Sequence, residues 1–202
     1  MTEPETEKSW LETPHGRLDY PVYLPDATYG MVRGVDAVDL EQAGVQGLVM
    51  NTFHLMQKPG SLTVQSLGGI HTMSGWSKPI ITDSGGFQAY SLIRENAKFG
   101  KINENGITIT PEGSKRKLLL SPEKTVQLQI SYGSDVVICL DQCTHPDDSD
   151  QVQRESVRRT IEWAKRCKHE FTKRLIHTEK DTKPPKIFGV VQGGNSFELR
   201  KT

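Results

Sequence analysis

The chain has 202 residues, enough for one sizeable hydrophobic core or slightly more. Lys and Arg total 25, as do Asp and Glu, so the zero net charge gives no overall basic field toward nucleic acid. The longest apolar runs, such as 136–140, cannot span a bilayer, and the start, MTEPETEKSW, has no secretory-signal pattern. We therefore expect a cytoplasmic protein with no membrane partner, and its three cysteines without a CxxC pair fit a reducing compartment.

Four short, continuous apolar runs predict strands that are buried on both faces, as in a parallel sheet. The runs are Gln46–Met50, Pro79–Thr82, Asp135–Leu140 and Lys186–Val191. Each run is followed by a polar side chain that could reach a pocket, and these side chains are Asn51, Asp83, Asp141 and Gln192.

Helical patterns lie between the runs. Residues 36–43 are predicted to form a helix that ends at Gly44. Ser121-Pro122-Glu123 begins a second helix that reaches Tyr132. The longest helix is predicted from Asp148 to about Leu175, with one apolar stripe. Its cations outnumber its acids, which predicts a solvated helix face, with an RNA-contacting stripe as the alternative. The cations are Arg154, Arg158, Arg159, Lys165, Arg166, Lys168, Lys173 and Arg174.

Two stretches predict β-hairpins. Residues 11–23 form one around His15-Gly16, and residues 101–109 form the other, with Asn105-Gly106 as a type I′ turn. The second hairpin lies in an insertion that is long for a βα loop. The segment 178–185 is a polar loop.

Parallel strands that alternate with helices indicate either a (β/α) barrel or a doubly wound sheet. A complete barrel of eight units needs about 250 residues. Because this chain has only four recognisable strands, the pattern is typical of half a barrel.

The stretch ITDSGGFQ, residues 81–88, places an acid and two glycines at the end of a predicted strand. Asp83 would point into the mouth where barrel enzymes bind substrates, and Gly85 and Gly86 would let a planar ligand lie against their backbone. An ordinary βα turn with a helix-capping side chain is the alternative explanation of these residues. Asp141 repeats the strand-then-acid arrangement, and Gln192-Gly193-Gly194 repeats the glycine pair.

These side chains together predict a polar pocket for a flat ligand that forms hydrogen bonds. An ionised Asp only accepts hydrogen bonds, whereas Gln both donates and accepts them. Guanine presents N–H donors at N1 and N2 and an acceptor at O6, which matches an Asp and a Gln, although other flat heterocycles match too. Asp83 and Asp141 could also be the catalytic pair of a different barrel enzyme.

Six ordered blocks resemble the tRNA-guanine transglycosylase family, the queuine tRNA-ribosyltransferases, in their bacterial form. The blocks are TPHG (13–16), NTFHLMQKPG (51–60), TDSGGFQ (82–88), LLSPE (119–123), GSDVVICLDQCT (133–144) and FGVVQGG (188–194). The resemblance implies a (β/α)₈ TIM-barrel fold with β-hairpin insertions. Residues 1–202 would be the N-terminal portion of that single domain, with a hairpin region at 1–33 and a β insertion at 97–120.

The family exchanges guanine at the wobble position of tRNAs with a GUN anticodon for a 7-deazaguanine, preQ1 or queuine. By resemblance, Asp83 is the general acid/base and Asp141 binds the N1/N2 edge of the base. The other substrate-binding residues would be Ser84, Gly85, Gly86, Phe87, Cys143, Gln192 and Gly193, with Phe87 stacking on the purine. Gln142 stands where bacterial members usually carry Glu, which removes a charge beside the base site. The resemblance also implies a homodimer.

Two parts of the family pattern do not occur in these residues. The nucleophilic Asp, which forms a ribosyl intermediate, and the CxCxxC…His zinc site lie further along the family's barrel. We therefore predict no metal ligands or cofactor within this chain, zinc in a full-length member, and no base exchange by residues 1–202 alone. Cys139 and Cys167 are predicted to be small core residues. A non-catalytic accessory subunit or a fragment is the alternative.

Overall fold

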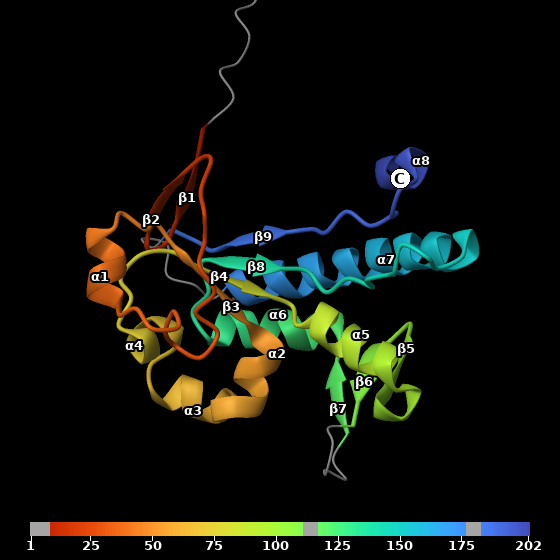
Figure 1. The fold of residues 1–202 in the computed structure, drawn as a ribbon, viewed down its shortest axis with the longest axis horizontal. Coiled ribbons are helices and arrows are strands. Elements are labelled where there is room, and N and C mark those ends of the chain that lie inside the picture. Colours follow the sequence, from red (N-terminus) through yellow and green to blue (C-terminus); the bar gives the residue numbers. More distant parts are fainter. Residues whose placement is uncertain (1–8, 111–116, 177–182) are drawn as a thin grey trace, which may run out of the picture.

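The computed structural model describes residues 9–110, 117–176 and 183–202, and it shows a mixed α/β fold around a parallel sheet (Figure 1). The acidic start of the chain and part of the predicted polar loop lie outside the described residues. The four-stranded sheet has the order β3-β4-β8-β9, and its strands are β3 (Leu48–Asn51), β4 (Ile80–Asp83), β8 (Val136–Ile138) and β9 (Lys186–Phe188).

The four predicted strands are confirmed, and all their pairings are parallel. β8 and β9 are shorter than the apolar runs predict. Their paired residues end with Ile138 opposite Phe188, and the chain continues toward Asp141 and Gln192 outside the ladder. The polar side chains at 83, 141 and 192 consequently follow the carboxyl ends of three adjacent strands.

The three predicted helices are confirmed, although α7 begins two residues after the predicted start at Asp148, and each start is capped. α1 (Ala37–Gln42) begins after Asp36, whose side chain accepts a hydrogen bond from the Asp39 N–H. α6 (Pro122–Ser131) and α7 (Asp150–Leu175) begin after Ser121 and Ser149, which cap them in the same way. A serine cap accepts a hydrogen bond from a backbone N–H that the first helical turn leaves unpaired. A proline at the first position has no N–H that would need a partner.

Helices also fill the connections that follow β3, β4 and β9. The first connection contains α2 (Thr52–Leu55), the segment η1 (Met56–Gly60), which is kinked at the extended residue Lys58, α3 (Ser61–Ser66) and α4 (Ile70–Ser74). After β4 come α5 (Gly86–Glu95) and the 3₁₀ turn η2 (Ala97–Phe99), and α8 (Phe197–Lys201) follows β9.

Both hairpins are present, but one predicted turn is wrong. The N-terminal hairpin pairs β1 (Trp10–Thr13) with β2 (Gly16–Asp19). The second pairs β5 (Gly100–Asn103) with β6 (Gly106–Ile109), and β7 (Leu118–Leu120) extends it to a three-stranded sheet.

The turn of this second hairpin is Glu104-Asn105, because Asn103 pairs with Gly106. The Asn103 side chain accepts from the Asn105 N–H at 2.9 Å and forms an Asx turn in place of the type I′ turn. Gly106 serves a different purpose: a Cβ there would lie 2.2 Å from the Leu120 carbonyl oxygen of β7. The glycine therefore permits a close strand approach inside the sheet.

Two hydrophobic clusters pack against the parallel sheet. One joins α5, α6, α7 and the three-stranded sheet, and its buried members include Trp163, Cys167 and Phe171 from α7. The other joins α1, the helices of the 52–74 connection, β3 and part of α6 around Trp76 and Tyr132. Cys139 also lies in the first cluster, so the prediction that Cys139 and Cys167 are core residues is confirmed. No helix in the described ranges is long and apolar enough to cross a membrane.

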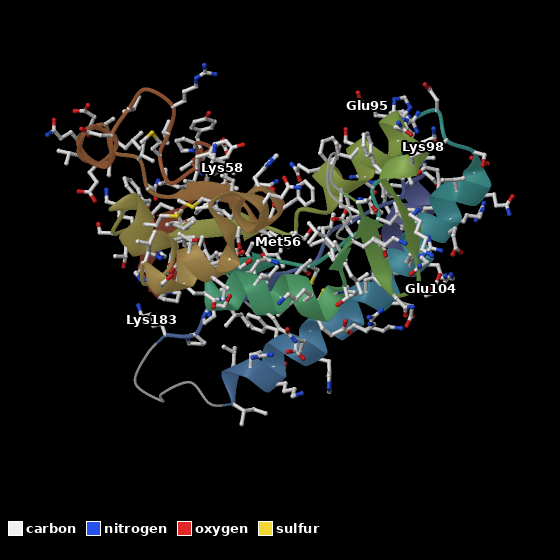
Figure 2. The ribbon with its side chains drawn as sticks, turned by 90° about the horizontal axis from the view of Figure 1, so that it is seen from below. Met56, Lys58, Glu95, Lys98, Glu104 and Lys183 are labelled. Carbon is white, nitrogen blue, oxygen red and sulfur yellow. The ribbon has the colours of Figure 1, made fainter. Side chains whose placement is uncertain are left out.

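The charges of α7 are largely paired within the chain, which favours the solvated face over an RNA-contacting stripe. Glu104, at the turn of the β5–β6 hairpin, lies beside α7 (Figure 2) and binds Arg158 at 2.7 Å and Arg159 at 2.9 Å. Further ion pairs join Arg166 to Glu123 and Arg174 to Glu170. These contacts fasten the inserted hairpin and α6 to α7.

Candidate functional site

The carboxyl ends of β3 and β4 bring Asn51 and Asp83 into direct register. The Asn51 side-chain amide donates to Asp83 Oδ2 at 2.8 Å. Backbone N–H groups of Gly85 and Thr52 donate to Asp83 Oδ1 at 2.9 and 3.3 Å. The Asp83 carboxylate is consequently held in one orientation by three donors from two neighbouring strand ends.

Burial raises the pKa of Asp83 from 3.8 to about 6, even though these three hydrogen bonds favour the charged form and lower it. A carboxyl group with a pKa near 6 can both hold and release a proton close to neutral pH. This property suits a general acid/base.

Asp141 and Gln192 meet beyond the ends of β8 and β9. The Gln192 side-chain amide donates to Asp141 Oδ2 at 2.6 Å. Burial raises the pKa of Asp141, and the hydrogen bond from Gln192 opposes that shift. The pairing leaves lone pairs of Oδ1 available to a ligand and fixes the amide so that its oxygen can accept a further hydrogen bond.

A buried glutamine separates the ends of β4 and β8. The β4–β8 register ends at Thr82 opposite Val137. Gln129 of α6 then binds both backbone groups of Ile138, accepting from its N–H and donating to its carbonyl oxygen, each at 2.9 Å. Because a side chain takes the place of the next strand residue, the β4–β8 pairing ends here, before Asp83 and Asp141.

The glycine pair forms a tightly packed wall of the site. Gly85 has a φ of +74°, and a Cβ there would lie 2.5 Å from the Cβ of Phe53. A Cβ on Gly86 would lie 3.1 Å from the Asp141 carbonyl oxygen, so the start of α5 rests against the strand end that carries the second acid. Ser84, which is buried, accepts from the Gly86 N–H at 3.3 Å.

We expect Gly85→Ala to reduce stability far more than the matched variant Gly44→Ala. Both glycines have a positive φ, which costs a residue with a Cβ roughly 1–2 kcal/mol, but Gly44 has open space around it. Any additional loss in Gly85→Ala therefore reports the collision with Phe53 and the displaced N–H donor to Asp83. Thermal unfolding measures the difference, and equal melting temperatures of both variants would contradict the packing argument.

The remaining predicted residues lie around this group. The Phe87 side chain is 59% exposed at the first turn of α5. Cys143 is half-buried, and burial together with the nearby Asp141 charge raises the pKa of its thiol, which disfavours a nucleophilic thiolate. Gly193 has a φ of +127° and packs against α8, where a Cβ would lie 3.0 Å from the Arg200 backbone nitrogen.

Gln142 is bound to α7. Its side-chain oxygen accepts from Arg159, its backbone N–H donates to Thr160 at 3.0 Å, and its carbonyl oxygen accepts from Ser156 at 2.6 Å. Asp141, the residue before it, instead binds Gln192. The Gln142 side chain therefore anchors the loop after β8 to α7.

Residue patterns alone missed two contributors to the site, Thr52 and Gln129, and they indicated Asn51 only as a polar side chain that could reach a pocket. Asn51 and Thr52 were recognisable only as the polar end of a predicted strand, and their contact with Asp83 depends on the register of β3 against β4. Gln129 lies within an ordinary amphipathic helix, so no local signal indicates that its amide binds a strand end.

Comparison with known proteins places this geometry in a family. Residues 8–202 match the family described as Queuine tRNA-ribosyltransferase. Enzymes of that name are similar over 95% of this chain in Thermotoga neapolitana, at 40% identity, and in Halothermothrix orenii, at 38% identity. One from Francisella tularensis subsp. holarctica is 36% identical over 98% of the chain. The aligned part is 48%, 48% and 50% of these relatives, so the chain spans about half their length. The chain belongs to the queuine tRNA-ribosyltransferase family.

Proposed function

We propose that the complete protein containing these residues exchanges guanine in the wobble position of GUN-anticodon tRNAs for a 7-deazaguanine. The observation that carries the proposal is the pair of partly buried carboxylates, Asp83 and Asp141, at the ends of neighbouring strands, with Gln192 bound to the second. Family membership over residues 8–202 supports the same reaction.

In this proposal Asp141 reads the base. Its free carboxylate oxygen accepts from guanine N1–H and N2–H, while the Gln192 amide and the Gly193 backbone face O6. The Phe87 ring, which is 59% exposed, is available to stack on the purine. The target nucleotide must leave its stack to reach such a pocket, so the enzyme binds it flipped out.

The chemistry needs a proton carrier as well as a nucleophile. Cleavage of the ribose–guanine bond gives C1′ oxocarbenium character, and an aspartate carboxylate outside this chain attacks C1′ to form a ribosyl ester while guanine departs. Asp83 donates a proton to the departing base and accepts one from the entering base, as in retaining glycoside hydrolysis. A pKa of about 6 lets Asp83 act in both directions.

The four-stranded sheet corresponds, on this proposal, to the first half of a (β/α)₈ barrel. β9 has no partner on its outer side among the described strands, and Phe188 in β9 and Val191 after it are 38% and 64% exposed. The next strand of a barrel would cover that edge. The residues present here would then supply the base reader and the proton carrier, and the other half would supply the nucleophile.

The reaction is tested by incubating protein from the complete reading frame with radiolabelled guanine and a tRNA carrying a GUN anticodon. We expect guanine to enter that tRNA and not a matched tRNA whose wobble base is adenine. Residues 1–202 alone should give no incorporation. Absence of incorporation by the complete protein would contradict the assignment, and base binding without exchange would instead identify an accessory subunit.

A further inference from the structure

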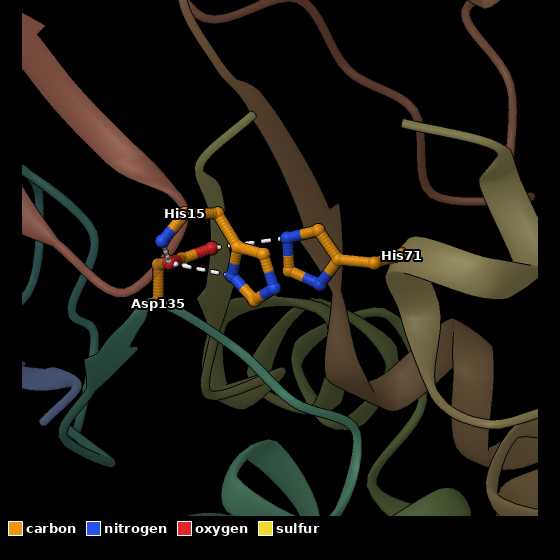
Figure 3. A group of neighbouring side chains, drawn as sticks. All are labelled: His15, His71 and Asp135. Carbon is orange, nitrogen blue, oxygen red and sulfur yellow. Dashed lines mark hydrogen bonds and ion pairs between the residues drawn. The ribbon is translucent and has the colours of Figure 1, made fainter. Parts of the chain in front are cut away.

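A second cluster of functional groups lies at the amino-terminal ends of the same strands. His15 comes from the β1–β2 turn, His71 from α4, and Asp135 directly precedes β8 (Figure 3). His15 Nδ1 lies 3.0 Å from Asp135 Oδ1, and His71 Nε2 lies 3.1 Å from Asp135 Oδ2. Side chains separated by up to 120 residues thus converge on one carboxylate.

The carboxylate is rigidly held by its backbone contacts. Asp135 is fully buried, and its two oxygens accept from the backbone N–H groups of His15 at 2.9 Å and Ile80 at 2.8 Å. These bonds leave each oxygen a further lone pair directed toward a histidine. Such outer hydrogen bonds orient the ligands of protein metal sites.

The histidine contacts do not fully satisfy the rings. His71 Nε2 is buried and, within the described residues, makes no hydrogen bond of good geometry despite its closeness to Asp135. The two imidazole rings stack with centroids 3.6 Å apart at an interplanar angle of 21°.

We propose that His15, His71 and Asp135 form a binding site for a divalent transition metal, of which Zn²⁺ is the representative ion. One ligand atom from each residue lies within 4.8 Å of the others. Bonds of about 2.0–2.2 Å place the ligands of a tetrahedral zinc roughly 3.3 Å apart, so small ring rotations would complete the set. Two imidazoles and a carboxylate are a common zinc ligand set.

The protons on the two histidine rings can be accounted for when the metal binds, without any further reactant. A neutral ring that donates to Asp135 moves its proton to its other nitrogen, so that Nδ1 of His15 and Nε2 of His71 present lone pairs to the metal. A protonated ring instead releases one proton to solvent. The His15 side chain is 41% exposed, which provides an entry path and room for a water ligand.

The position of the site indicates a structural role. It lies at the opposite ends of the strands from Asp83 and Asp141, on the face where barrel residues contribute stability. A bound ion would join the N-terminal hairpin, α4 and the start of β8. The sequence analysis predicted no metal ligands in this chain, on the ground that the family's zinc site lies further along the barrel; His15, His71 and Asp135 are far apart in sequence and form no local metal-binding pattern.

The test compares wild-type protein from the complete reading frame with the double variant His15→Asn/His71→Gln. Asn and Gln keep an N–H near the original ring nitrogens, so the carboxylate keeps its donors, but amides bind zinc poorly. After removal of metal and reloading with Zn²⁺, the wild type should hold about one ion per chain more than the variant. The difference in zinc content between wild type and double variant reports only this site, because any other metal of the complete protein is present in both. The control His169→Gln, on the exposed face of α7, should match the wild type.

A second measurement needs no variant at the site. Zn²⁺ should protect His15 of the wild type from acylation by diethyl pyrocarbonate, read by mass spectrometry, while His169 of the same molecule stays reactive. Zn²⁺ should also raise the wild-type melting temperature by several degrees more than that of the double variant. Equal metal content in wild type and double variant, or unprotected His15 with excess Zn²⁺, would overturn the proposal.

Discussion

Asp141→Ala should weaken guanine binding by about 100-fold or more in the complete protein. The variant would leave the N1–H and N2–H donors of the bound guanine without an acceptor, and each donor that is buried unpaired costs about 1–3 kcal/mol. It also removes the acceptor of the Gln192 amide, now 2.6 Å from Asp141 Oδ2. Calorimetric titration with guanine measures the affinity.

Two further variants make the Asp141 test specific. Asp141→Asn keeps the size of the side chain but presents a donor beside an acceptor, so it should also lose affinity. Asp147→Asn is the matched control, because the Asp147 side chain is 87% exposed and should be silent. If Asp141→Ala or Asp141→Asn bound guanine as tightly as the wild type, Asp141 would not read that edge of the base.

Asp83→Asn should lower the rate of base exchange by about 10²- to 10⁴-fold, the usual contribution of a positioned proton carrier. Guanine affinity should change much less, because Asp141 and Gln192 remain. The wild-type rate should show an inflection near the Asp83 pKa of about 6, and the Asn variant should lack it. Exchange rates measured across that range test both statements.

Removing the hydrogen bond from Asn51 should shift the pH inflection in a known direction, which tests whether Asp83 is the titrating group. Its amide donates to the Asp83 carboxylate at 2.8 Å and lowers the pKa, so Asn51→Ala should move the inflection above pH 6. An inflection that stays in place in Asn51→Ala, or persists in Asp83→Asn, would assign the titrating group to another residue.

The raised pKa of Asp83 also makes the stability of the protein depend on pH. The folded pKa of about 6 exceeds the reference value of 3.8, so the folded state binds more protons between these pH values. The contribution of Asp83 to the unfolding free energy is complete below 3.8 and is lost as the pH rises through 6. Asp83→Asn should therefore gain stability relative to wild type across that window, as denaturant titrations at several pH values would measure.

Local signals in the sequence were sufficient for most of the architecture. Continuous apolar runs indicated the four strands, and Asp36, Ser121 and Pro122 marked helix starts, because capping and periodicity act over only a few residues. The acids at 83 and 141 were recognisable for the same reason: each directly follows such a run.

Longer-range packing decided the rest. The hairpin turn falls on Glu104-Asn105 because the Asn103 side chain binds locally and Gly106 must lie against β7. The side chain of Gln142 binds α7, and strand register brings Asn51 to Asp83. His15, His71 and Asp135 meet only when a turn, a helix and a strand start converge. No window of sequence contains such a group, because the contacts between distant segments exist only once the sheet and its covering helices have packed.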